Sequence, residues 1–307
     1  MTATVEGSGW REDPERIRHA LEANRIVHFR ACPVPMPDAA TLDFLRRELP
    51  VRLKLKNISF HPEAGRVSGI EADAATTLRV TDVLRSHLND VCAFLRRVTG
   101  DLTQDARIGT CSFRPIEEKG RNLKPHASNE LVHVDAGAYG ATNGDRILRF
   151  FVNVHPDRDR VWATKGPFDE LLDRCGRQAG LLDEAGRLCV PITKGGRDRA
   201  FSAVVSGLAR LNPLATVLDS SPYDRAMRRL HNYMKDDETF KADMTGYQEI
   251  RFPPQSAWMV FTDGVSHASL EGQYALVTTM IVRRARMRHP DRSPFEVLLS
   301  RAPARAA

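Results

Sequence analysis

The sequence lacks the features that mark membrane-spanning, secreted and disulfide-bonded proteins. No apolar run approaches the ~18 residues that a membrane-spanning helix needs, and residues 1–18 contain no hydrophobic segment that could serve as a secretory signal. The five cysteines are odd in number and none is spaced as Cys-X-X-Cys, which disfavours a disulfide framework and a zinc ribbon. These absences predict a protein of the reducing cytoplasm.

The sequence also lacks a strong charge of either sign. Its 45 Lys and Arg residues against 39 Asp and Glu residues give a formal net charge of +6. This excess is compatible with an anionic membrane surface, an acidic small molecule or nucleic acid, and equally with no specific partner. The densest basic stretch, residues 283–292, has no interleaved aromatic residues and so lacks the stacking platform of a single-strand binder. We expect no nucleic-acid partner, while peripheral membrane contact and a homo-oligomer stay open.

Helix signals dominate the first hundred residues. Asp13 and Asp38 are suited to cap helices over residues 12–24 and 37–49. The longest signal, over residues 76–98, repeats apolar side chains every three or four positions along one face. Three helices are therefore predicted in this part of the chain.

Beyond Asp105, short runs rich in β-branched and aromatic residues replace the helix pattern. Strands with this spacing favour an antiparallel sandwich or barrel. A helical insert with Ser221 as its cap interrupts them over residues 221–237. The predicted strands lie within residues 107–116, 130–136, 146–156, 257–264 and 273–282.

No repeat, low-complexity tract or linker divides the 307-residue chain, and 42% of its residues are hydrophobic, enough to bury a core. We therefore expect one α+β domain over residues 1–307. Within it, residues 1–104 form a mainly helical N-terminal layer, and residues 105–300 form a β core that carries the helical insert.

A His-X-Asp triplet, His133 and Asp135, stands in the segment ELVHVDAGAYG, residues 130–140. With 10 histidines in the chain, about one such triplet is expected by chance, so the match alone is only a hypothesis. His267 could supply a third ligand, because it lies between two predicted strands beside an Asp-Gly turn. Such a 2-His-1-carboxylate set suits non-haem Fe(II), but the residues alone equally allow three ordinary side chains. The other downstream histidines have contexts typical of surface, packing or tail positions: His155, His231 and His289.

An oxygenase that uses 2-oxoglutarate also needs a cation inside the barrel for the far carboxylate of that cosubstrate, and Arg binds carboxylates through two hydrogen bonds. In RILRFFVNV, residues 146–154, strand alternation places Arg149 and Asn153 on one face and an apolar set on the other. Arg149 is therefore the candidate for the cosubstrate, with Asn153 on the same polar face. Arg146 is the reserve, because the phase of a predicted strand can shift by a residue. The alternative is that Arg149 faces solvent.

Several blocks of the sequence resemble one known family. They include SFRPIEEKGR (112–121), LVHVDA (131–136), GDRILRFFVNVHP (144–156) and FPPQSAWMVFTDGVSHASLEGQYAL (252–276). In this order they resemble the Kdo hydroxylases, Fe(II)- and 2-oxoglutarate-dependent oxygenases that act on 3-deoxy-D-manno-octulosonic acid (Kdo) of lipopolysaccharide. The resemblance extends from about residue 25 to residue 300.

The resemblance implies a cupin-like double-stranded β-helix, or jelly-roll, in which His133, Asp135 and His267 bind Fe(II). It further implies that 2-oxoglutarate and O2 are consumed while C3 of Kdo is hydroxylated on a lipid A precursor. The expected location is then the cytoplasmic face of the inner membrane, and the partner is a lipid-linked or small-molecule sugar. An acidic sugar needs cations at the mouth of the barrel. The candidates in family-like blocks are Lys56, Asn57 and Arg114.

The sequence departs from the family pattern close to the metal triplet. LKPHASNE (123–130) stands in place of a Trp-Arg-Lys-Asp-Asp run, AGAYGATN (136–143) in place of Ala-Phe-Pro, and LVTTM (276–280) in place of Leu-Glu-Gln-Thr-Phe. These changes keep the ligands and alter what surrounds them. Three hypotheses stay open: hydroxylation of Kdo on a lipid, the same chemistry on a soluble acidic or polyhydroxylated metabolite, and a non-catalytic cupin-like protein that binds a metal or a sugar.

Overall fold

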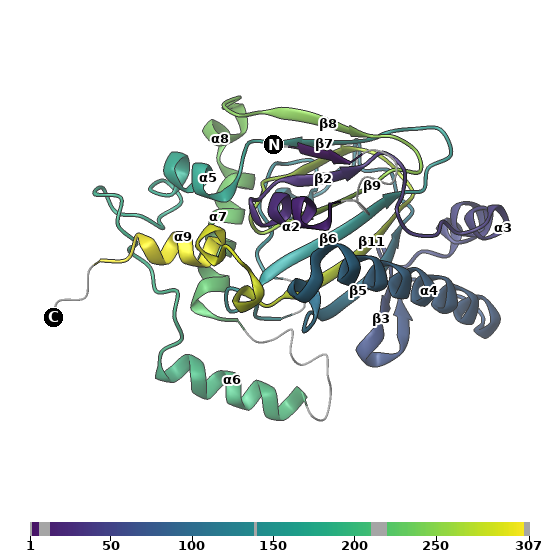
Figure 1. Cartoon of the computed structure of the whole chain (residues 1–307), viewed down its shortest axis with the longest axis horizontal. Coiled ribbons are helices and arrows are strands. Elements are labelled where there is room, and N and C mark those ends of the chain that lie inside the picture. Colours follow the sequence, from purple (N-terminus) through teal and green to yellow (C-terminus); the bar gives the residue numbers. More distant parts are fainter. Residues whose placement is uncertain (1, 6–12, 138–139, 210–219, 304–307) are drawn as a thin grey trace.

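Two β-sheets organise the part of the chain that the computed structural model describes, which is residues 2–5, 13–137, 140–209 and 220–303 (Figure 1). Apart from the parallel pair β1–β2, neighbouring strands are antiparallel. The larger sheet consists, in spatial order, of β1 (Thr2–Val5), β2 (Ile26–Phe29), β9 (Ala257–Phe261), β6 (Arg146–Asn153), β11 (Ala275–Val282), β5 (Arg107–Arg114), β3 (Ile58–His61) and β4 (Arg66–Ser68). The smaller sheet consists of β10 (Ala268–Glu271), β7 (Arg160–Thr164) and β8 (Gln248–Phe252).

Helices surround these sheets. None of the described helices combines the length and the apolar character needed to cross a bilayer. A short π-helical segment, Phe44–Glu48, continues α3, and a 3-10 turn, Pro125–Ala127, precedes the metal triplet. The α-helices are α2 (Pro14–Glu22), α3 (Ala39–Asp43), α4 (Ala74–Thr99), α5 (Phe168–Cys175), α6 (Gly196–Ala209), α7 (Pro222–Asp236), α8 (Glu238–Ala242) and α9 (Pro294–Ser300).

The predicted helices begin at their capping residues. Asp13, Asp38 and Asp73 each accept a hydrogen bond from the backbone N–H three residues later, at the starts of α2, α3 and α4. Ser221 and Asp224 form a reciprocal capping box at the start of α7. Each cap satisfies an N–H group that has no partner within the helix. All four predicted helices are thereby confirmed.

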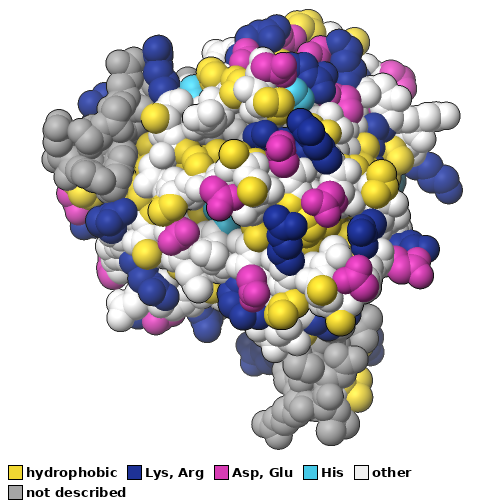
Figure 2. All heavy atoms as spheres, turned by 90° about the vertical axis from the view of Figure 1, so that its right-hand side faces the viewer, with side chains coloured by type: hydrophobic (Ala, Val, Ile, Leu, Met, Phe, Trp, Pro, Cys, Tyr) yellow, Lys and Arg dark blue, Asp and Glu magenta, His cyan; other side chains and the backbone are white. Residues whose placement is uncertain are grey.

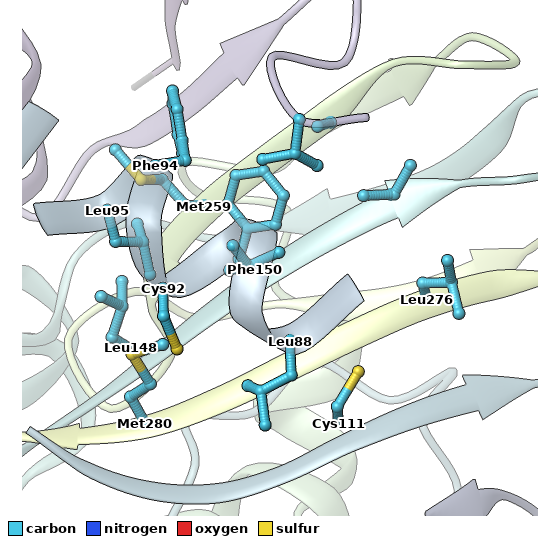
Figure 3. Packing of buried hydrophobic residues seen from close by; sticks show 14 of the residues in the cluster. Leu88, Cys92, Phe94, Leu95, Cys111, Leu148, Phe150, Met259, Leu276 and Met280 are labelled. Carbon is cyan, nitrogen blue, oxygen red and sulfur yellow. The ribbon is translucent and has the colours of Figure 1, made fainter. Parts of the chain in front are cut away.

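One face of α4 packs against the larger sheet (Figure 3). Leu88, Cys92 and Leu95 of the helix lie over a hydrophobic surface of β6 and β11 that includes Phe150 and Met280. All five side chains are buried, as the helical spacing of apolar residues predicts. α2 adds to the same layer, so the two helices cover one face of the larger sheet.

The opposite face of the larger sheet meets the smaller sheet. Phe151 of β6 stacks on Trp258 of β9 at 5.0 Å between ring centroids, and Trp162 of β7 contacts both rings edge-on. Phe252 of β8 stacks on Trp258 at 3.9 Å. These aromatic side chains fill the space between the two sheets. The expected α+β class with antiparallel sheets is therefore confirmed.

The alternation predicted for residues 146–154 is confirmed. Leu148, Phe150 and Val152 belong to the hydrophobic core under α4. Arg149 and Phe151 face the other side of the sheet, where they line a pocket. The two-residue period of the strand thus separates the packing face from the pocket face.

The other predicted strands are confirmed as β5, β9 and β11, except for one. Residues 130–136 form no strand, because their backbone does not pair continuously with one neighbour. His133 forms an isolated bridge with His267, and the N–H of Asp135 donates to the carbonyl of Thr262. The N-terminal part contributes four short strands, β1 to β4, beside its helices. The smaller sheet is not predicted by the sequence pattern, because β7 is buried along its whole length and shows no alternation.

The basic stretch at residues 283–292 is largely neutralised by nearby carboxylates. Arg284 pairs with Glu296, and Arg286 and Arg288 pair with carboxylates of more distant segments. Figure 2 shows a face of the molecule on which Lys and Arg side chains alternate with Asp and Glu side chains. Neither observation indicates an extended surface of one sign.

Replacing Phe150 tests the packing between α4 and the sheet. Phe150 is 1% exposed and contacts the rings of Phe29 and Phe94. Phe150→Ala should lower the free energy of unfolding by about 3–5 kcal/mol, because the cavity cannot be filled by its neighbours. Urea denaturation measures the loss. As control, Leu78→Ala in α4, where the side chain is 61% exposed, should cost no more than about 0.5 kcal/mol. Equal losses in both variants would show that the interface is not the core.

Candidate active site

His133, Asp135 and His267 converge, although His267 comes much later in the chain. One potential ligand atom of each residue lies within 4.8 Å of the other two. The ring centroids of His133 and His267 are 4.7 Å apart, and Nε2 of His133 is 3.8 Å from Oδ1 of Asp135. Both imidazoles are buried, and the Asp135 side chain is 13% exposed. Among the residues that the structure describes, no other group of this kind is found.

An isolated antiparallel bridge positions the two histidines. The N–H of His133 donates to the carbonyl of His267 at 3.0 Å, and the reverse bond measures 2.8 Å. Residues directly opposite each other in such a bridge place their side chains on the same face. Asp135 follows His133 by two residues, and its backbone N–H is held by the carbonyl of Thr262 at 2.9 Å.

Each histidine also has its ring orientation fixed by a backbone carbonyl. Nδ1 of His133 donates to the carbonyl of Leu131 at 2.7 Å, and Nδ1 of His267 donates to the carbonyl of Val265 at 3.1 Å. Because Nδ1 carries the proton, Nε2 of each ring is left with its lone pair. This arrangement is typical of histidines that bind metals through Nε2.

The charge states also suit a metal. Burial lowers the pKa of His267 to about 4. Burial, together with the charge on His267, holds the pKa of His133 well below its usual value. Burial acts to raise the pKa of Asp135, but Arg149 and the two histidines outweigh it, and this pKa lies well below the usual range. Near neutral pH the cluster therefore offers two neutral imidazoles and one carboxylate, the forms that bind a metal ion.

The polar atoms of Arg149 indicate that the site can take up a further group. Its Nη2 forms an ion pair with Oδ2 of Asp135 at 2.9 Å. Its Nε is buried without a hydrogen-bond partner. Buried polar atoms are normally satisfied, so this N–H fits a site that accepts a further group. Two imidazoles and one carboxylate leave open positions on Fe(II) for such groups.

The cluster lies in a pocket with a volume of about 290 Å³. Arg149 lines this pocket, as do the three predicted sugar-binding residues, Lys56, Asn57 and Arg114. The structure thus brings these four side chains together with the candidate metal ligands. Further polar residues of the lining are Ser59, Ser112, His126, Asn129, His231, Lys235, Ser269 and Thr279.

Arg146 and Asn153, the other cosubstrate candidates, lie outside the pocket lining. Arg146 is fully buried, with Nε 2.7 Å from Oδ2 of Asp263 and Nη2 2.8 Å from Oδ1 of Asn24. The amide of Asn153 donates to the carbonyls of Phe252 and Arg158. Asn153 does share a face with Arg149, but four residues of strand separate them by about 13 Å. Both side chains stabilise the fold instead.

The histidine predictions outside the triad need correction. His231 does pack, with its ring 4.9 Å from that of His133 and Nδ1 on the carbonyl of Val134, but it also lines the pocket. His155 is buried rather than on the surface, because it stacks on Tyr274 and accepts an N–H of Arg158.

Lys235 is a pocket residue that the sequence analysis missed. It follows His231 by four residues on α7, so both side chains lie on one face of that helix. The sequence signal was this spacing alone, which also occurs on any solvated helix face. Within the altered loop after the triplet, residues 138 and 139 lie outside the described residues.

Sequence comparison decides the family. Residues 6–304 match the family described as 3-deoxy-D-manno-oct-2-ulosonic acid (Kdo) hydroxylase. The chain belongs to the Kdo hydroxylase family. The predicted resemblance is therefore confirmed, and so are the predictions of an enzyme and an oxidoreductase, which counts against a non-catalytic binding protein. No curated protein matches the chain.

Solved structures of the Kdo hydroxylase KdoO, a non-haem Fe(II) α-ketoglutarate-dependent dioxygenase, are similar over nearly the full length. The complex with α-ketoglutarate and Fe(III) has 27% identity and a TM-score of 0.79, covering 97% of this chain and 95% of that one. The complex with succinate and Fe(III) has 26% identity and a TM-score of 0.79, covering 100% and 98%. The complex with cobalt(II) has 26% identity and a TM-score of 0.80, with the same coverage.

Cobalt(II) provides a direct test of the candidate metal ligands. The chain should bind one Co(II) ion, visible by its d–d absorption. His133→Ala or His267→Ala should weaken this binding at least about 100-fold, because each removes a ligand. His231→Ala is the matched control within the same pocket and should stay within about tenfold of the unaltered chain. Loss of the Co(II) spectrum in His231→Ala but not in His267→Ala would contradict the assignment.

Proposed function

We propose that the chain is an Fe(II)- and 2-oxoglutarate-dependent hydroxylase of Kdo. The observation that carries the proposal is the buried cluster of His133, Asp135 and His267, which opens into a pocket lined by cations in a chain of the Kdo hydroxylase family. The relative KdoO binds α-ketoglutarate and succinate beside iron. These are the cosubstrate and its decarboxylated product in 2-oxoglutarate chemistry.

We further propose that the two sheets form a cupin-like double-stranded β-helix and that residues 1–307 fold as one domain, with the β core in residues 105–300. Both sheets contribute to the pocket, which supports this proposal. Arg149 and Thr279 come from the larger sheet, and Trp162 and Ser269 come from the smaller one. A site enclosed between two sheets is typical of this architecture.

His133, Asp135 and His267 would hold the iron ion. When bound, iron supplies the activation of O2, so that one oxygen atom enters a substrate C–H bond while 2-oxoglutarate becomes succinate and CO2. The pocket residues position the reactants. The aromatic layer of Phe151, Trp162 and Trp258 closes one side of the space between the sheets and limits the access of water.

Arg149 would bind the far carboxylate of 2-oxoglutarate. It lies opposite Thr279 of β11 in the sheet register, and both side chains line the pocket. Its buried Nε is without a partner and its Nη2 contacts Asp135. A guanidinium in this position can offer two parallel N–H groups to a carboxylate. The contact with Asp135 keeps the guanidinium of Arg149 beside the candidate metal ligands.

Lys56, Asn57 and Arg114 would bind the acidic sugar. All three line the pocket. The pKa of Lys56 is lowered mainly by burial, and the positive charges of Arg114 and Arg149 lower it further. An excess of positive charge of this kind favours an anionic substrate. In Kdo the carboxylate carbon C1 is two bonds from C3, so holding the carboxylate also orients the C3–H bond.

Two forms of the substrate are candidates. We propose that Kdo is presented on a lipid A precursor at the cytoplasmic face of the inner membrane, in keeping with the family and with the basic net charge of +6. The second candidate is a soluble acidic metabolite. It is favoured by the altered segment 123–130, because His126, Ala127 and Asn129 of this segment line the pocket.

Two arginine variants separate cosubstrate binding from structural support. Arg149→Met should weaken 2-oxoglutarate binding by the metal-loaded protein about 10- to 100-fold, because a charge-assisted pair is lost. Arg146→Met should instead lower the free energy of unfolding by about 3–5 kcal/mol, because Asp263 stays buried without its partner. Anaerobic calorimetry on folded protein measures the first effect and denaturation the second. Unchanged 2-oxoglutarate affinity in Arg149→Met would assign the cosubstrate to another cation.

Succinate release tests the proposed function itself. The Fe(II) protein is supplied with 2-oxoglutarate and O2, and with Kdo on a lipid A precursor, with the methyl glycoside of Kdo, or with no sugar. Stimulation by the lipid with a mass gain of one oxygen atom is the expected result. Stimulation only by soluble sugars would favour the second candidate. No succinate from metal-loaded protein under any of these conditions would overturn the oxygenase assignment.

A further inference from the structure

Lys235 of α7 is a buried cation whose bonding is incomplete. Its side chain is 2% exposed. Nζ donates to the carbonyl of Ser128 at 2.9 Å and to the carbonyl of His126 at 3.3 Å. An ammonium group has three donors, so one N–H remains for another acceptor, on a side chain that lines the pocket.

No carboxylate of the described residues forms an ion pair with Lys235. Buried charges in proteins are normally paired, because an isolated charge loses its hydration without compensation. Burial lowers the pKa of Lys235 to about 8; the charge of Asp135 opposes this shift, that of Lys56 adds to it, and that of Asp236 opposes it. Lys235 thus lies within electrostatic range of two carboxylates, Asp135 and Asp236, and of a second pocket lysine, Lys56, but it forms an ion pair with neither carboxylate.

Lys165 shows how a lysine with a purely structural role is bonded in this protein. It is also 2% exposed, and its Nζ donates to two carbonyls, those of Phe240 and Lys241. Its ammonium additionally lies 4.5 Å from the centre of the Phe240 ring, a cation–π contact. Lys165 does not line the pocket that contains the metal cluster. Lys235 differs from Lys165 because its side chain lines the pocket, where the third N–H of its ammonium can meet a ligand.

The position of Lys235 is fixed before any ligand arrives. The loop that accepts its two hydrogen bonds is also tied to α7 by His126, whose Nε2 lies 2.7 Å from Oδ2 of Asp236. Asn129 at the end of the loop donates to Glu118. An ammonium held in this way loses little conformational entropy when it binds an anion, which favours affinity and selectivity.

We propose that Lys235 and Lys56 together bind the carboxylate of the acidic sugar, in a subsite separate from the Arg149 position that takes 2-oxoglutarate. The inference rests on the proposed function, which it deepens by assigning a specificity-determining residue. Lys235 belongs to α7, Lys56 to the segment before β3 and Arg149 to β6, so the two anions of the reaction are received by different elements. The subsite then selects sugars that carry a carboxylate on the carbon next to the hydroxylated one.

The test compares ligands with and without the carboxylate. The Fe(II) protein with 2-oxoglutarate is titrated anaerobically with the methyl glycoside of Kdo and with the methyl ester of that glycoside, and the KM of each is measured in air. Lys235→Met should weaken binding of the acid about 10- to 100-fold, since a hydrogen bond to a charged group is lost. The ester should bind the altered and unaltered proteins equally weakly. Lys235→Arg should recover most of the affinity for the acid.

Lys165→Met is the matched control. It removes a lysine with the same exposure and the same two-carbonyl bonding, and it should leave the affinity for the acid within about twofold. Unchanged affinity for the acid in Lys235→Met would overturn the inference. Equal weakening for acid and ester would also overturn it, because it would show that Lys235 acts only by holding the loop. Failure of the unaltered protein to hydroxylate Kdo would instead overturn the proposed function.

Discussion

The pair of backbone hydrogen bonds between His133 and His267 is the constraint on which the site depends. It joins an irregular segment to the connection between β9 and β10 and places two imidazoles side by side. Asp135 joins them because its own N–H is bound by Thr262, at the end of β9. Three backbone bonds therefore set the geometry, and the side chains only complete it. These bonds use main-chain atoms only, so they place no requirement on the side chains of the flanking segments.

A second constraint is the pairing of buried charge. Arg146 is compensated by Asp263, and Arg160 by Glu118, at 2.7 and 2.9 Å. Both pairs lie in the framework of the sheets. In the pocket the balance of charge differs. Lys56 and Lys235 line it beside Asp135, but the carboxylate of Asp135 is already paired with Arg149 and lies against the two histidines. The protein thus neutralises its framework charges internally and directs its uncompensated charge into the pocket.

Local signals predicted much of this structure, and long-range packing decided the rest. Capping residues gave the helix starts, and the two-residue period of residues 146–154 separated Arg149 from the core. The same period could not distinguish Arg149 from Asn153, because both share a face and differ only in distance from the cluster. Lys235 resembles a solvated residue of an amphipathic helix until α7 is placed beside the loop at residues 125–129. β7 went undetected because burial on both sides removes the alternation that marks a strand.

The anchoring of that loop has a consequence for how such an enzyme can evolve. Lys235 holds the loop through the main-chain carbonyls of residues 126 and 128, which every amino acid possesses. The bonds from Lys235 therefore do not depend on which side chains stand at residues 126 and 128, and the backbone bonds that position the metal cluster do not involve this loop. The side chains that this loop presents to the pocket, those of His126, Ala127 and Asn129, thus vary separately from the residues that would hold the iron.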